Sequence, residues 1–206
     1  MKKIVAIVFL CLFSICVVSG KSRDTFIEKV DLKLKEGEIG IVFLPIKEDI
    51  YLLIKTKENS ILLGVEEGDA SIKPILKKLG QNIVDYNLSK QDIGKNKISL
   101  ETPFLLDNIE IEKKEDNILL KLQDRLLTIY RDGSLEETEY VYFLKPTEIE
   151  KGDIKLAFYN DHFDEDFEKE LTTYWIDSYK IKKNEFTIVK FTSDSYNVIR
   201  IPEYYF

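Results

Sequence analysis

The sequence is poor in the side chains that bind soft metals and act as nucleophiles. Its two cysteines, Cys11 and Cys16, both precede residue 20, and its one histidine is His162. Beyond residue 20, this excludes a thiol nucleophile and a zinc site built from several cysteines and histidines. A serine–histidine–aspartate triad would depend on His162 alone. Carboxylate chemistry remains, and an enzyme is not the default interpretation.

The first twenty residues have the pattern of an export signal. Lys2 and Lys3 form a short basic start, residues 4–18 are apolar except for Ser14, and small residues follow at 18–20. The apolar run is shorter than the roughly 20 residues that a membrane-spanning helix needs. We therefore expect residues 1–20 to be a signal peptide that is cleaved.

The remaining residues, 21–206, are expected to form a single exported domain, periplasmic or extracellular. An uncleaved signal or lipidation at Cys16 would instead anchor the chain to a membrane. The residue before Cys16 is Ile15, which is larger than a bacterial lipidation motif prefers. Cleavage would leave a mature chain without thiols, and hence without disulfides.

Charge and composition set limits on the partners. The chain has 30 basic and 37 acidic residues, a net charge of −7, and removal of Lys2 and Lys3 leaves 28 against 37, or −9. This excess of acid disfavours binding to a nucleic-acid backbone, which relies on clustered lysine and arginine. An aromatic content of 12% argues against disorder. The partner we expect is an unidentified protein or component of the cell envelope.

Short apolar or alternating runs, rich in β-branched residues, dominate the pattern. They predict strands at residues 39–45, 50–55, 60–65, 83–88, 109–111, 118–122, 126–130, 140–144, 154–159, 186–191 and 197–201. Asp132 and Gly133 mark a turn after the strand at 126–130. No linker rich in proline, glycine or serine divides the chain. The expected fold class is α+β, with strands in excess.

Two helices interrupt the strands. The first is expected to begin at Ser71 as N-cap, with Pro74 in its first turn, and to close at Gly80. The second is expected over residues 164–178, with acids near its start that complement the helix dipole. We expect its apolar face to contain Phe163, Phe167, Leu171, Tyr174 and Trp175.

Several short segments, in this order, resemble a known superfamily. They are residues 42–46 (VFLPI), 52–56 (LLIKT), 60–64 (SILLG), 75–80 (ILKKLG), 83–86 (IVDY), 117–122 (NILLKL) and 127–132 (LTIYRD). Together they resemble the metallo-β-lactamase superfamily, most closely the domain of the bacterial competence DNA-uptake channel protein. The resemblance implies an αββα sandwich with a β-rich core, possibly truncated.

The metal-binding histidines of that family are absent. Where family enzymes have Thr-His-x-His-x-Asp-His, this chain has Leu-Ser-Lys-Gln-Asp-Ile-Gly at residues 88–94, which retains only Asp92 and Gly94. Asp132 occupies the position of the bridging aspartate, and His162 resembles a late ligand histidine. Gly64 stands where the family has aspartate. Asp92, Asp132 and His162 are weak candidates for a hard-cation site, and separately solvated loops are the favoured interpretation.

The resemblance therefore implies a degenerate, non-catalytic member with no assigned cofactor, used for binding or as a structural component. One alternative is a weak divalent-metal-dependent hydrolase. Another is a small outer-membrane β-barrel, suggested by the aromatic terminus Tyr204-Tyr205-Phe206. The last quarter of the chain is rich in amphipathic aromatics, including Trp175. Such residues are common at binding surfaces and equally common in half-buried strands.

Overall fold

The computed structural model describes residues 34–46, 49–68, 71–133, 135, 138–149, 152–183, 185–192 and 194–202. The expected signal peptide and the aromatic terminus lie outside these described residues.

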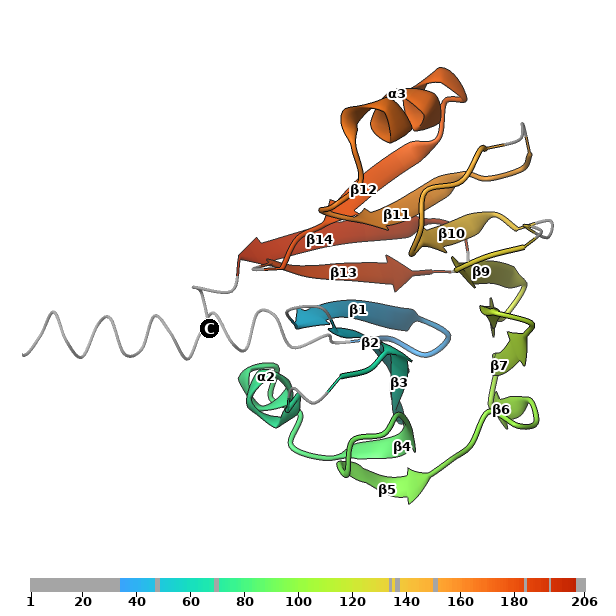
Figure 1. The fold of residues 1–206 in the computed structure, drawn as a ribbon. Helices are drawn as coiled ribbons and strands as arrows, with labels where there is room; N and C mark the ends of the chain where they lie inside the picture. The colour runs from blue at the N-terminus through green and yellow to red at the C-terminus, as the bar shows by residue number, and fades with distance from the viewer. Residues whose placement is uncertain are drawn as a thin grey trace, which may run out of the picture.

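Seven strands form the first sheet, in the order β14-β13-β1-β2-β3-β4-β5 (Figure 1). They are β1 (Ile39–Ile46), β2 (Asp49–Lys55), β3 (Ser60–Glu66), β4 (Val84–Leu88), β5 (Gly94–Lys97), β13 (Glu185–Phe191) and β14 (Tyr196–Pro202). Neighbours from β14 to β3 are antiparallel, whereas β3, β4 and β5 are parallel. Helix α2 (Lys73–Lys78) lies in the crossover from β3 to β4.

The second sheet repeats this plan. Its order is β12-β11-β10-β9-β8-β7-β6. Its strands are β6 (Phe104–Leu106), β7 (Ile109–Lys114), β8 (Asn117–Leu122), β9 (Arg125–Tyr130), β10 (Tyr140–Phe143), β11 (Leu156–Asn160) and β12 (Asp177–Ile181). Strands β6 to β9 are antiparallel, and β9 to β12 are parallel. Helix α3 (Glu165–Thr173) connects β11 to β12. Each sheet thus contains an antiparallel meander, β1-β2-β3 or β6-β7-β8-β9, that is extended by parallel strands, and the hairpin β13-β14 completes the first sheet beside β1.

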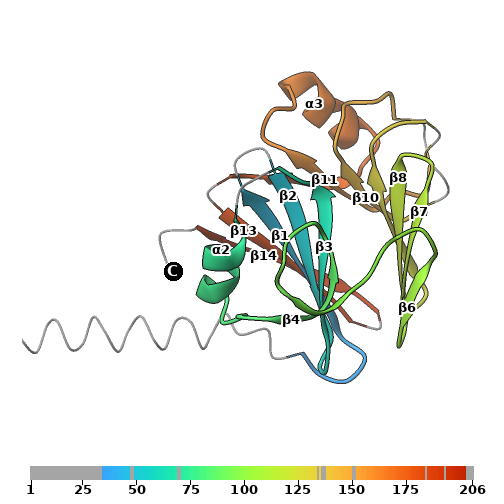
Figure 2. The same cartoon turned by 60° about the horizontal axis from the view of Figure 1, so that its bottom comes forward.

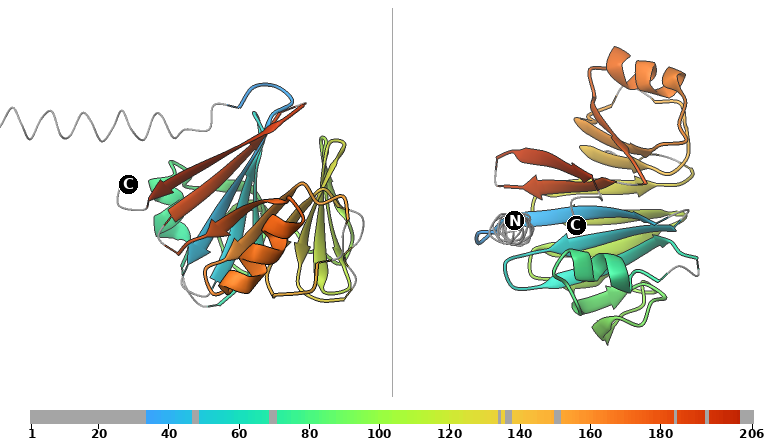
Figure 3. Two further views of the ribbon diagram at one scale, coloured as in Figure 1. Left: turned by 90° about the horizontal axis from the view of Figure 1, so that it is seen from above. Right: turned by 90° about the vertical axis from the view of Figure 1, so that its left-hand side faces the viewer.

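Three apolar layers hold these elements together. Figures 2 and 3 show the arrangement of the two sheets with helices α2 and α3. Alternate residues of β1 show how they are built, since Phe43 faces the second sheet and Val42 faces α2. Helix α2 covers the outer face of the first sheet through Leu76, and α3 covers that of the second through Phe167 and Leu171. Because inner strands are buried on both faces, their sequences are nearly continuous apolar runs.

The expected strands are confirmed, with shifts at their ends, and so is the β-rich α+β class. Strands β5 and β6 were not predicted. The N-cap of α2 is Ile72, and Ser71 is exposed and not the cap. The second helix was predicted too long, because it ends at Thr173 and residues 177–181 form β12. Placing Tyr174 and Trp175 on its buried face was wrong, as both are exposed.

Candidate functional site

Parallel strands of both sheets end at one side of the sandwich, around a cavity of about 220 Å³. In the first sheet the lining comes from the ends of β3 and β4, at Val65 and Leu88. In the second it comes from the ends of β9 and β10, at Arg131 and Leu144. We call this cavity the cleft. Ligand sites of open sheets with parallel strands form outside the carboxyl ends of the strands. The cleft has that position in both sheets.

Arg131 links the two sheets at the cleft. It follows β9, and its Nη2 donates to the carbonyl oxygen of Val65 in β3 at 2.9 Å. The same nitrogen lies 3.9 Å from Oε1 of Glu66, and the Arg131 side chain is 34% exposed. Its Nε is buried and has no hydrogen-bond partner among the described residues. The guanidinium is therefore held in place while part of it remains open to a ligand.

Asn117 positions the segment that carries Arg131. Its Oδ1 accepts the backbone N–H groups of Arg131 at 2.8 Å and of Asp132 at 3.3 Å. Its Nδ2 donates to the carbonyl oxygen of Asp132 at 3.0 Å. Asn117 is only 6% exposed, so these bonds form away from water. One side chain thus fixes the course of the chain as it leaves β9.

The opposite wall of the cleft contains Glu67, which folds back over Gly64. A Cβ atom added at Gly64 would lie 2.2 Å from Cδ of Glu67, so the glycine leaves room for this side chain. The Glu67 carboxylate also accepts the backbone N–H of Lys90. The Glu67 carboxylate therefore lies beside Gly64 at the wall of the cleft.

Charges of both signs surround an apolar floor in the cleft. Lys113 and Arg131 supply two cations, and Glu67 and Asp116 supply two carboxylates. The floor includes the buried side chains of Val65, Ile129 and Leu144. An arrangement of this kind can orient a small molecule that has a charged group and an apolar body.

The three weak metal candidates lie in exposed loops that follow β4, β9 and β11. Asp132 accepts the backbone N–H of Gly133 at 2.8 Å, and the ring of His162 lies 4.8 Å from that of Phe163. Across the described residues, no group of three or more histidine, cysteine, aspartate or glutamate side chains could hold a metal ion. Asp92, Asp132 and His162 are therefore not brought together. As the structure places them, these three side chains do not form the donor set of a metal centre.

Acids around His162 have structural partners. Asp164 caps α3 by accepting the backbone N–H of Phe167 at 3.0 Å. Three acids of α3 form ion pairs or accept backbone groups: Asp166 with Lys169, Glu168 with Lys180, and Glu170 with the N–H of Ile149. The expectation that these acids support the helix start is confirmed for Asp164.

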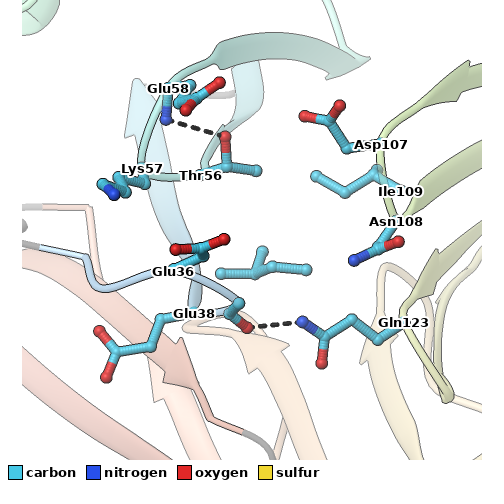
Figure 4. A pocket seen from close by; sticks show the side chains of 11 residues that line it. Glu36, Glu38, Thr56, Lys57, Glu58, Asp107, Asn108, Ile109 and Gln123 are labelled. Carbon is cyan, nitrogen blue, oxygen red and sulfur yellow. Dashed lines mark hydrogen bonds between the residues drawn. The ribbon is translucent and has the colours of Figure 1, made fainter.

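A second cavity, of about 240 Å³, lies at the other end of the strands (Figure 4). It is lined by four carboxylates, among them Glu38 and Asp107. Glu38 pairs with Lys190 at 2.7 Å, which lowers the pKa of its carboxyl group. Asp107 accepts a hydrogen bond from Asn59 at 3.2 Å. Glu38 and Asp107 thus hold neighbouring segments together, and the cavity indicates no particular ligand.

Arg131, Asn117 and Glu67 are the site residues that the sequence analysis did not single out. Arg131 appeared there only as a member of the LTIYRD segment.

Neither α2 nor α3 is long and apolar enough to cross a membrane, and the structure describes no other helix. Comparisons with protein-family models, curated proteins and solved structures return no match for this chain.

Proposed function

We propose that this chain is an exported domain of the metallo-β-lactamase-like fold that works as a binding module outside the cytoplasm. Two matching halves support the fold assignment, because each has an antiparallel meander, added parallel strands and one helix on its outer face. The order of the family-like segments along the chain supports it as well. The N-terminal pattern of residues 1–20 supports export.

The observation that carries the binding role is the position of Arg131. Its guanidinium is held by Val65 at the place where strands of both sheets end, and it stays partly exposed beside an apolar floor. A partly desolvated guanidinium recognises carboxylates and phosphates by charge-assisted hydrogen bonds. The ligand class that fits is a small amphipathic anion, with its charge on Arg131 and its apolar body against Leu144.

Titration of isotope-labelled protein with hexanoate tests this function by nuclear magnetic resonance. Hexanoate is expected to shift the amide signals of Val65, Arg131 and Leu144, whereas hexylamine, of similar size and opposite charge, is not. Arg131→Gln should weaken hexanoate binding at least tenfold. The matched control is Arg200→Gln, which alters an exposed arginine on β14. Equal binding of the amine, or full binding by Arg131→Gln, would contradict the assignment.

Metal content tests the degenerate character of the site separately. After dialysis against zinc, manganese or calcium, the protein is expected to retain much less than one metal ion per chain by mass spectrometry. Near-stoichiometric metal that is lost in Asp132→Ala would overturn this expectation. It would favour the alternative of a metal-dependent hydrolase that uses Asp92, Asp132 and His162.

A further inference from the structure

Trp175 has a backbone conformation that large side chains rarely adopt. Its φ angle is +61°, in the left-handed region. Its N–H donates to the carbonyl oxygen of Thr172 at 3.1 Å, and the N–H of Ile176 donates to that of Leu171 at 3.0 Å. These two bonds form the Schellman motif that ends α3, in which glycine normally occupies the left-handed position. A tryptophan here strains the backbone.

The indole of Trp175 is also left in solvent. Trp175 is 94% exposed, which is the largest exposed fraction among the exposed large hydrophobic residues that the structure describes. Tyr174 beside it is 39% exposed. The neighbours that stabilise the motif are Leu171 and Ile176, which are both buried. Trp175 therefore combines a strained backbone with a large exposed apolar side chain that gains little packing. Strain of this kind persists where function requires it.

The surroundings of Trp175 favour a cation. The last turn of α3 contains no basic residue, so no lysine or arginine of the helix itself offsets the partial negative charge of its C-terminus. Within α3, four acids stand against one base, Lys169; Asp166 and Glu168 are paired with lysines, and the helix itself remains acidic. The face of an indole ring attracts lysine ammonium and arginine guanidinium groups. A basic group placed over Trp175 would satisfy both the ring and the helix end.

We propose that Trp175 is the anchor for a partner protein that presents arginine or lysine to the C-terminus of α3. Exposed tryptophans paired with arginine are typical of the residues that dominate binding energy at protein interfaces. This surface is separate from the cleft, because Trp175 precedes β12 and the cleft lies at the opposite, carboxyl ends of the parallel strands. The anchor does not depend on the binding role of the cleft.

Fluorescence of the purified protein tests the proposal directly, because the chain contains one tryptophan. A tetra-arginine peptide is the probe, and a tetra-glutamate peptide is its matched control. The arginine peptide is expected to lower the acrylamide quenching constant of Trp175 at least twofold and to shift its emission to shorter wavelength. Equal quenching in the presence of either peptide would overturn the proposal.

Variants separate specific binding from attraction by the net charge of −7. Affinity is measured by the anisotropy of dye-labelled tetra-arginine. Trp175→Gly, which suits the left-handed position and keeps the fold, is expected to weaken binding at least fivefold. Trp175→Tyr should retain part of the affinity. Leu105→Ala, at a residue that is 70% exposed on β6, should have no effect. Unchanged affinity in Trp175→Gly would show that only overall charge is at work and would reject the anchor.

Discussion

The ring of Phe43 in β1 lies against the ring of Phe158 in β11, with their centroids 4.7 Å apart. Phe43 also meets Tyr142 of β10 edge to face at 5.0 Å. All three side chains are fully buried between the sheets. An early strand is thereby joined to strands about a hundred residues later, and this contact fixes the distance between the sheets that form the cleft.

Replacing Phe43 with alanine should cost about 3–5 kcal/mol in the free energy of unfolding, because it removes the ring contacts and leaves a cavity in a closely packed core. Urea unfolding followed by circular dichroism measures the loss. Phe43→Leu is the control, and it should cost clearly less because it keeps most of the volume. A cost below about 1 kcal/mol for the alanine variant would mean that the sheets do not pack as described.

Asn117→Ala should free the segment that carries Arg131. Three hydrogen bonds are lost at a site that is 6% exposed, so we expect a loss of about 2–3 kcal/mol in unfolding free energy. Hydrogen exchange at the amides of Arg131 and Asp132 should also become faster. Asn197→Ala, at an exposed position of β14, serves as control. Unchanged exchange at both amides would contradict the positioning role of Asn117.

Asp85 should make the stability of the fold depend on pH in the acid range. The ammonium of Lys95, 2.6 Å from Oδ1, lowers the pKa of the Asp85 carboxyl group, and Ser60 adds hydrogen bonds to Oδ2. Because the folded pKa lies below the ordinary value of 3.8, the unfolded state binds more protons. The stability that the charged Asp85 contributes is fully present above the ordinary pKa of 3.8, and it disappears as the pH falls through the lower pKa of the folded protein.

Asp85→Asn should therefore cost about 1 kcal/mol at neutral pH, since a charge-assisted bond to Lys95 is lost, and its cost should vanish in strong acid. Thermal unfolding at a series of pH values measures this difference. Asp166→Asn removes an ion pair that is fully open to solvent, and no measurable effect is expected at any pH. If the loss of stability in Asp85→Asn does not change with pH, the charge of Asp85 is not its cause.

Trp175→Gly should raise stability by about 1 kcal/mol, because glycine adopts the left-handed conformation without the Cβ penalty. Chemical unfolding of the variant, monitored by circular dichroism, provides the test. In the wild-type protein, the emission of the single tryptophan should change little on unfolding, since Trp175 is 94% exposed when folded. A large shift to longer wavelength on unfolding would show that the indole is buried.

Prediction from sequence succeeded where a segment had its own periodicity. The runs that became β1, β2 and β3 are apolar and bounded by polar turns, so their identity needs no knowledge of their neighbours. It failed for β5, whose sequence Gly-Lys-Asn-Lys has no apolar alternation and is strand only because it pairs with β4. It failed again at residues 174–178, where aromatic spacing indicated helix and the left-handed turn at Trp175 ended it.

The candidate site was predictable only in part. The scarcity of histidine and cysteine, read from composition, already made Asp92, Asp132 and His162 weak candidates for a metal site. The positions of Arg131 and Asn117 could not be read in the same way, because the guanidinium of Arg131 is held by a carbonyl oxygen 66 residues away in β3. Local patterns carry no information about such partners.

The apolar strands, the existence of the two helices and the acidic balance follow from residue types and their spacing, because burial on one or both faces dictates where apolar side chains must fall. The convergence of strand ends at the cleft and the exposure of Trp175 are consequences of how the sheets and α3 pack. They depend on contacts between residues far apart in the chain, and therefore only the folded structure decides them.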